Sequence, residues 1–400
     1  MKPEPAAAPG PEPGHDWDPS LPVHQENPFA IHRELRAKCP VAHSDQWGGF
    51  WTLTKYEDIR AVGVDKERYT ATVRSIVPSS PKVGLPRLPL QADAPQLGVY
   101  RKALSPWFSD PYTNRLEPAV RALAVDLLEP LVGGHDADVV GGFAEPFTVR
   151  ALCLFLGMSD AEADRLKNLS IHYVEVVQAQ DLKTAAAISR EIDGFAISLV
   201  ENRKAHPGDP RTDVTTGLLQ MNRFTDTEVA GMVRLSLIGG HIVPKNFLGS
   251  VLRHFADNPA HIGMLRDSPA LIADAIEEML RLYSPNQALA RTTTCPVEVR
   301  GKRIEADQPV AMLFLSANRD EEIFEAPDEF RLGRKQKHIA FGYGQHSCIG
   351  QQFARMQARV TVEELVRRID RIEIAGAVQN AVWPEYGVAG MRARLYPHIA

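Results

Sequence analysis

Cysteine is scarce in this chain, with 4 cysteines among 400 residues. Cys39, Cys153, Cys295 and Cys348 lie far apart, without a CxxC pair and without the spacing of a zinc finger. This pattern excludes a disulfide-stapled secreted scaffold and predicts separate thiols in a reducing compartment. Long apolar runs are also missing, because no stretch approaches the roughly 20 residues that cross a bilayer. The sequence therefore predicts a cytoplasmic protein with no membrane partner.

An excess of positive charge is absent as well. The formal net charge is −5, from 45 basic and 50 acidic residues, which argues against general nucleic-acid binding. Residues 1–19 are rich in Pro, Ala and Gly, and they lack the basic start and apolar centre of a signal peptide. We therefore expect a disordered leader over residues 1–19 and a folded domain over residues 20–400. The hydrophobic content of 44% suffices for a large core.

The most informative stretch is a glycine-punctuated loop near the C-terminus. It reads Phe341-Gly342-Tyr343-Gly344-Gln345-His346-Ser347-Cys348-Ile349-Gly350. Apolar residues then recur at helical spacing to about residue 370, which places Cys348 at the start of a helix. There the helix dipole and unpaired backbone N–H groups stabilise a thiolate. The alternative is a loop with an inert buried cysteine, and the fixed spacing of Phe, Gly, His and Cys argues against it.

That spacing, FxxGxHxCxG, resembles the haem-binding loop of the cytochrome P450 family. The resemblance implies a mainly α single domain with small β-sheets (α+β) that binds heme b. Cys348 would be the axial iron ligand, and His346 would reach a haem propionate. The surrounding cofactor contacts would be Phe341, Gly342, Gly350 and Ala354.

Three further elements resemble the family. Arg101 matches the basic end of an HxxxR element that holds a propionate, although Leu97 stands at the histidine position. Arg291 matches a second propionate-binding arginine. Glu278 and Arg281 form an ExxR pair on one helix face. In the family this pair joins a buried structural network with a later arginine, for which Arg334 is the candidate.

The central helix departs from the family. A capping box at residues 225–228 predicts a long helix that runs to Pro259. Where the family has an acid followed by an alcohol, this chain has Ile242 and Val243, and neither relays a proton. Pro244 has no N–H for the Gly240 carbonyl, which predicts a kink there.

Several groups remain candidates for the missing proton relay. They are His241, Lys245 and water at the carbonyl of Gly240. A packed helix histidine is an equal alternative for His241, and packing is favoured for Lys245. The residues expected at the oxygen-activating side are Gly240, His241, Val243 and Pro244.

Substrate contacts are expected from four segments that line the pocket in the family. Proline prevents a long helix in residues 70–96, which makes this stretch a loop. The candidate substrate contacts are Val83, Leu85, Leu88, Leu237, His241, Ala288, Leu289 and Val388.

The resemblance also implies the reaction and its partners. The expected enzyme activates dioxygen, with electrons from a ferredoxin and ferredoxin reductase, to oxidise a small organic molecule in bacterial secondary metabolism. The basic run at residues 334–338, with Lys102, Arg355 and Arg359, predicts a positive docking surface for an acidic ferredoxin. Two alternatives stay open: oxidative coupling, rearrangement or peroxide-driven chemistry without oxygen insertion, and a non-catalytic haem-binding accessory protein.

Overall fold

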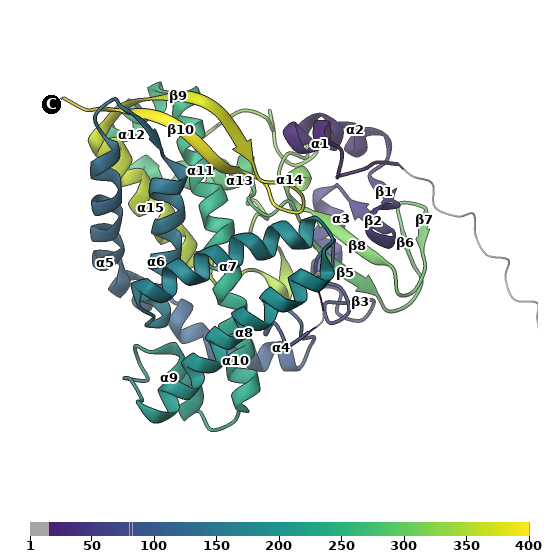
Figure 1. The fold of residues 1–400 in the computed structure, drawn as a ribbon. Coiled ribbons are helices and arrows are strands. Elements are labelled where there is room, and N and C mark those ends of the chain that lie inside the picture. Colours follow the sequence, from purple (N-terminus) through teal and green to yellow (C-terminus); the bar gives the residue numbers. More distant parts are fainter. Residues whose placement is uncertain (1–15, 80, 82, 400) are drawn as a thin grey trace, which may run out of the picture.

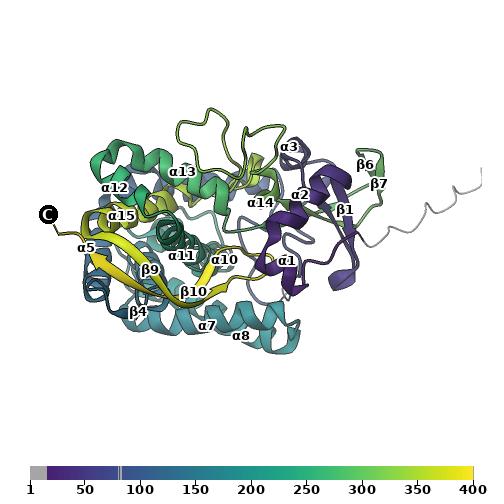
Figure 2. The same cartoon turned by 90° about the horizontal axis from the view of Figure 1, so that it is seen from above.

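The computed structural model describes residues 16–79, 81 and 83–399. Helices build most of the molecule, and a sheet with the N-terminal helices lies at one end (Figure 1). The view from above shows helices α7 and α8 along one edge and α12, α13 and α15 toward the other (Figure 2). The fold is the mainly α domain with small sheets that the resemblance implied. No helix in the described part of the chain is long and apolar enough to span a bilayer.

The elements follow the chain in this order. The helices are α1 (Pro22–Glu26), α2 (Pro28–Lys38), α3 (Tyr56–Val64), α4 (Gln96–Leu104), α5 (Asp110–Leu128), α6 (Glu145–Leu156), α7 (Asp160–Gln178), α8 (Leu182–Ala205), α9 (Val214–Gln220), α10 (Asp226–Gly239), α11 (Ile242–Asp257), α12 (Ala260–Asp267), α13 (Ile272–Tyr283), α14 (Phe314–Ala317) and α15 (Gln351–Arg368). The strands are β1 (Val41–Ser44), β2 (Phe50–Leu53), β3 (Tyr69–Thr70), β4 (Asp136–Asp138), β5 (Ala288–Thr293), β6 (Val297–Val299), β7 (Lys302–Ile304), β8 (Pro309–Leu313), β9 (Ile369–Asn380) and β10 (Val388–Pro397).

Three sheets are formed by these strands. The largest has the order β1-β2-β8-β5-β3, in which only β2 and β8 pair in parallel. A second sheet has the order β4-β10-β9, and β6 pairs with β7. Because β9 and β10 are adjacent antiparallel strands, the chain turns back between them at residues 381–387.

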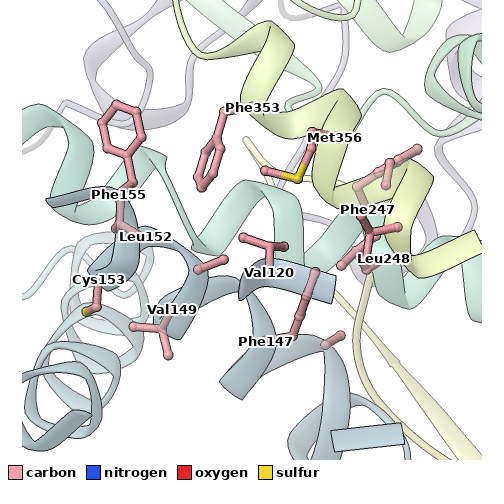
Figure 3. Close-up of a cluster of buried hydrophobic side chains, with 14 of the residues drawn as sticks. Val120, Phe147, Val149, Leu152, Cys153, Phe155, Phe247, Leu248, Phe353 and Met356 are labelled. Carbon is pink, nitrogen blue, oxygen red and sulfur yellow. The ribbon is translucent and has the colours of Figure 1, made fainter. Parts of the chain in front are cut away.

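The main hydrophobic core joins the helix that follows the cysteine loop to the helices around it. Phe353 and Met356 of α15 point toward α6 and α5, where Phe155, Leu152 and Val120 meet them (Figure 3). Burying each such side chain contributes about 1.5–3 kcal/mol. The packing therefore fixes the start of α15, and with it the position of the cysteine before it.

The described part of the predicted leader is ordered. Trp17 is only 4% exposed, and its indole N–H donates to the Thr52 hydroxyl at 3.2 Å. The N–H of Asp16 donates to the His43 carbonyl at 2.8 Å. The expectation of disorder is therefore wrong for residues 16–19, because Trp17 completes a small core beside β2. Residues 1–15 lie outside the described chain.

The central helix is two helices rather than one kinked helix. The capping box at Thr225 and Glu228 opens α10 as predicted. However, α10 ends at Gly239, and His241 has φ −133° and ψ −38° before α11 begins. Pro244 is the third residue of α11, where a missing N–H costs no helical hydrogen bond. The proline thus lies in the first turn of a new helix instead of bending a continuous one.

Candidate active site

The cysteine loop is held by backbone contacts and by α3. The Cys348 N–H donates to the Phe341 carbonyl at 2.8 Å. Gly344 has φ +75°, and a Cβ there would lie 1.9 Å from the Gly63 carbonyl oxygen of α3. Only glycine allows both this backbone conformation and this approach. The Arg355 guanidinium lies 4.6 Å from the centre of the Phe341 ring and covers one side of the loop.

The Cys348 thiol sits at the start of α15, where opposing influences act on its pKa. Burial has the largest effect and raises the pKa, whereas the Gly350 N–H and the Arg101 and Arg355 guanidinium groups lower it. The side chain is nevertheless exposed, so its free surface faces an interior space. The Ala354 N–H donates to the Gly350 carbonyl at 3.0 Å, which continues the helix from this point. A metal cation facing this surface would favour the thiolate.

Arg291 and Arg101 both act on His346, which lies two residues before this cysteine. Arg291 is 5% exposed, and its Nη1 donates to the Ala290 carbonyl at 2.7 Å. Burial lowers its pKa to about 10 and also lowers the pKa of Arg101. Neither arginine forms an ion pair with a carboxylate within the described residues. Burial and Arg291 together lower the pKa of His346 to about 4, so its imidazole is neutral near pH 7.

These groups fit the cofactor that the sequence predicts. Cys348 offers a soft sulfur ligand suited to haem iron. Arg101, Arg291 and His346 offer N–H donors, and the two cations, of which Arg291 is buried and Arg101 partly buried, still need anionic partners. An iron porphyrin with two propionates supplies the metal and both anions. The donor set and the electrostatics therefore match heme b.

Asp93 is a member of this site that the sequence did not reveal. It lines a pocket together with Arg291 and His346. Its carboxylate accepts the Ala71 N–H at 3.0 Å and the Thr70 hydroxyl. It also counteracts the lowering of the pKa values of Arg291 and His346. Asp93 thus anchors the loop of residues 70–96 at the propionate end, and no motif or periodicity marks it in the sequence.

The break between α10 and α11 presents two glycines in different settings. No atom lies within 4 Å of a Cβ placed on Gly239, so this residue faces open space. A Cβ on Gly240 would lie 2.6 Å from the Ser236 carbonyl oxygen and 2.8 Å from Leu152 of α6. Val243 and Pro244 follow as partly exposed residues. The surface of the break between α10 and α11 that faces the open space is therefore apolar.

His241 does not project into that space. The residue is 1% exposed, and burial followed by the charge of Lys245 lowers the pKa of its imidazole to about 3. A histidine with this pKa is neutral near pH 7 and holds no proton to donate as an imidazolium. His241 is thus a buried residue at the helix break.

The predicted structural network is present in the fold. Glu278 accepts hydrogen bonds from Arg281 Nε and Nη2, both at 2.8 Å. Arg334 Nε donates to the same carboxylate at 2.9 Å. Arg281 also donates to the carbonyls of Asn318 at 2.9 Å and Pro327 at 2.6 Å. The network ties α13 to the segment that leads into the cysteine loop.

Known proteins are similar to this chain in sequence and in fold. The family model "Cytochrome P450" matches residues 266–373. The chain is 32% identical to "Probable cytochrome P450 127A1" of Sinorhizobium fredii, over 82% of this chain and 78% of that protein. It is 30% identical to the beta-dihydromenaquinone-9 omega-hydroxylase of Mycobacterium tuberculosis, over 96% of this chain and 79% of that protein.

The chain belongs to the cytochrome P450 family. A solved structure of a mutant of P450 EryK in complex with erythromycin B superposes with a TM-score of 0.82 at 27% identity, and covers 92% of this chain and 95% of that one. As a P450, the protein is a monooxygenase-type oxidoreductase and binds heme through a cysteine thiolate. In this chain the exposed thiol at the start of α15 is Cys348.

The predicted substrate contacts of this P450 fall into two groups. Val83, Leu85 and Leu289 are partly exposed and remain candidates. The others have little or no free surface, because they pack within the cores. Their exposed fractions are 5% for Leu88, 0% for Leu237, 2% for Ala288 and 5% for Val388. We therefore reassign this second group, with His241, from substrate contact to packing.

The predicted basic docking surface is smaller than the sequence suggested. Arg355 pairs with Glu277 at 2.6 Å, and Arg359 pairs with Glu117 at 2.5 Å. Arg334 is engaged by Glu278, as described above. Opposite charges close to these arginines reduce the field that a partner protein would meet. Within this predicted surface, Lys102, Lys335 and Lys337 are exposed and form no ion pair with a described residue.

Glu385 is a second residue that the sequence did not reveal. It lies in the turn between β9 and β10, and its carboxylate accepts a hydrogen bond from Asn246 Nδ2 of α11 at 2.8 Å. Burial raises the pKa of this carboxyl to about 7, against the opposing effects of Lys245 and Asn246. A single glutamate in a C-terminal turn carries no sequence signal for such a position.

Proposed function

We propose that this P450 activates dioxygen with electrons from a ferredoxin and its reductase, and oxidises a small organic molecule in bacterial secondary metabolism. The observation that carries the proposal is the arrangement around Cys348. An accessible thiol at a helix start lies within the electrostatic influence of the partly buried Arg101, and neither Arg101 nor the buried Arg291 has a carboxylate partner among the described residues. We further propose that protons reach the oxygen-activating side by a route other than the acid–alcohol pair, since Ile242 and Val243 cannot carry them.

The side chains of this P450 have separate tasks in the reaction. When bound, the haem supplies dioxygen activation, and a thiolate ligand such as Cys348 favours O–O cleavage. Arg101 and Arg291 neutralise the propionates, and neutral His346 donates a hydrogen bond to one of them. Val83, Leu85 and Leu289 contribute apolar surface that excludes water from the substrate. This apolar surface fits a predominantly hydrophobic substrate.

Optical spectra test the proposal on the purified protein. The reduced protein with carbon monoxide should show the absorption band of thiolate-ligated haem, and Cys348→Ala should lose this band. Titrating the ferric protein with a panel of small molecules should shift it from low to high spin when a ligand displaces iron-bound water. Arg303, an exposed arginine paired with Glu305, supplies a control variant Arg303→Leu that should retain both responses. A wild-type protein without the thiolate band would contradict the proposal.

Coupling or rearrangement of the substrate is a second candidate function. The observation that favours it is the apolar pair Ile242–Val243, because oxygen insertion ordinarily requires proton delivery that these side chains cannot provide. Turnover under labelled dioxygen separates the two reactions, since insertion places label in the product and coupling does not. Comparing ferredoxin-driven with peroxide-driven turnover then identifies the oxidant.

A further inference from the structure

The turn that carries Glu385 is fixed by two other segments of the chain. Gln287 Nε2 donates to the Glu385 carbonyl at 2.7 Å, and the Tyr386 N–H donates to the Pro285 carbonyl at 2.9 Å. Gly387 then presses against α11, where a Cβ would lie 2.4 Å from the Asn246 carbonyl oxygen. The backbone position of Glu385 is therefore defined by contacts on both sides.

The Glu385 residue is partly exposed, and its carboxyl has no close counter-ion among the described residues. Its hydrogen bond from Asn246 Nδ2 is 2.8 Å long, and no lysine or arginine in the described chain forms an ion pair with it. The charged group that faces it is Lys245 of α11, while Asn286 and Gln287 on its other side are neutral. Burial dominates these influences and raises the carboxyl pKa to about 7. Glu385 is thus poised to gain and lose a proton near neutrality.

Asn246 places this carboxyl relative to the helix break. Residues four apart lie on one face of a helix, one turn of about 5.4 Å from each other. Asn246 is four residues after Ile242, so the carboxyl bound to Asn246 lies about one turn along the face of Ile242. Ile242 stands where the family carries its acid. The turn between β9 and β10 therefore brings an acid close to the position that α11 leaves apolar.

Polar groups without a protein hydrogen-bond partner lie near the Glu385 carboxyl. Asn246 Oδ1 is buried and has no hydrogen-bond partner within the described residues. Lys245 is 7% exposed, and its ammonium group keeps contact with solvent while forming neither a hydrogen bond nor an ion pair with a described residue. Buried groups of this kind require polar partners, which water supplies when protein does not. The cluster thus has the donors and acceptors that hold water next to the carboxyl.

We propose that Glu385 is the proton donor for the oxygen-activating side of this P450, acting from the C-terminal turn in place of an acid on the central helix. The inference rests on the proposed function and names the proton source of that same site. The O–H bond of the Glu385 carboxyl breaks, the proton passes to water held by Asn246 and Lys245, and it moves on toward the break at Gly240. Solvent returns one proton to the carboxylate, and no electron passes through the residue. His241 is unsuited to this task because its imidazole is neutral near pH 7.

Infrared titration of the ferric holoenzyme tests the proton-holding group without turnover. The wild type should show a carboxylic acid band that titrates near pH 7, and Glu385→Gln should lack it. Asn246→Ala removes a hydrogen bond that lowers the carboxyl pKa, so it should move the midpoint of the band to higher pH. The matched control is Glu373→Gln, which removes an exposed carboxylate paired with Arg394 on the same sheet. A band that persists in Glu385→Gln, or a midpoint unmoved by Asn246→Ala, overturns the proposal.

Dioxygen reduction tests the transfer itself and needs no organic substrate. With a plant-type ferredoxin, its reductase and NADPH, the wild-type rate should fall as pH rises through 7, because the protonated carboxyl is the donor. Glu385→Gln should be slower by about tenfold or more at pH 6, should lose this pH dependence, and should release a larger share of peroxide. Ile242→Glu in the Glu385→Gln protein should recover part of the rate, since it returns an acid to the helix face.

The outcomes separate this inference from the proposed function. A wild type that forms thiolate-ligated haem but reduces no dioxygen with ferredoxin contradicts the proposed function. A wild type that reduces dioxygen, with Glu385→Gln unchanged in rate and pH profile, contradicts the inference alone. A Glu385→Gln protein with an unchanged rate but altered spin-shift responses to the small-molecule panel makes Glu385 a substrate contact instead. If Glu385→Gln loses its haem, Asn246→Ala tests the inference instead. A higher infrared midpoint with a matching shift of the pH profile supports the inference, and an unchanged midpoint contradicts it.

Discussion

Glu278 of α13 accepts a hydrogen bond from Arg334 Nε at 2.9 Å, although 56 residues separate them in the chain. The carboxylate is 4% exposed and also binds Arg281, so it balances two guanidinium groups in a buried setting. Removing one partner of such a network leaves uncompensated charge. This relationship connects the stability of the fold to the position of the cysteine loop.

We expect Glu278→Gln to lower the free energy of unfolding by about 3–5 kcal/mol, because two arginines lose their buried counter-charge. Chemical denaturation measures this change, and the carbon monoxide spectrum should show less incorporated haem. Glu57→Gln is the control, since its ion pair with Arg60 is exposed and contributes about 0–1 kcal/mol. Equal effects of the two variants would contradict the structural role of the network.

Arg291→Leu should change stability and cofactor affinity in opposite directions. Burial lowers the pKa of this arginine to about 10, so folding without haem leaves its charge poorly compensated. The haem-free variant should therefore gain about 1–3 kcal/mol of stability, while haem binding weakens because a propionate loses its cation. Denaturation of the apoprotein and transfer of haem to an acceptor protein measure the two effects. The control Arg303→Leu should change neither the stability nor the haem affinity. If Arg291→Leu keeps full haem affinity, Arg291 does not bind a propionate.

His346 should contribute to the loss of stability in acid. Its pKa is about 4 in the fold and 6.5 as the ordinary value, so the unfolded chain binds more protons between these limits. Stability then rises with pH across this window and falls as the pH drops through it. His346→Gln should flatten the slope of melting temperature against pH between about 4 and 6.5. An unchanged slope would mean that His346 titrates normally.

Glu385 should have the opposite linkage. Its pKa is raised from 4.5 to about 7, so the folded state binds more protons between these values and stability falls as pH rises. Glu385→Gln should therefore be more stable than the wild type at pH 8, by about 1–3 kcal/mol, and similar to it at pH 4. Denaturation midpoints at both pH values check this. Glu373→Gln should not gain stability at pH 8, because its carboxylate is exposed and paired.

Charge on the exposed face near the cysteine loop should govern electron transfer. Lys102, Lys335 and Lys337 are exposed and free of ion pairs in the described chain, whereas Arg355 and Arg359 are paired. Replacing the three lysines with glutamate should slow ferredoxin-driven reduction by about tenfold at low salt. Added salt should reduce the difference in rate between this variant and the wild type. Stopped-flow reduction measures the rates. Lys183→Glu, on the α8 side of the molecule, is the control and should leave them unchanged.

Features that depend on short spacings along the chain could be predicted from the sequence. The glycines at 342 and 344, His346 and Cys348 follow one another in a loop, so the residue types alone indicate the thiolate ligand. Glu278 and Arg281 share a helix face because they are three residues apart. The capping box at Thr225 likewise predicted the start of α10.

Contacts between residues far apart in the chain could not be predicted from such spacings. Asp93 reaches the propionate end through its bonds to Thr70 and Ala71, and Trp17 is ordered by β2. Leu237 is apolar in either role, and only its burial shows that it packs in the core. Glu385 meets Asn246 from 139 residues away. Its raised pKa comes from the protein around it, and burial by distant segments leaves no pattern in the sequence.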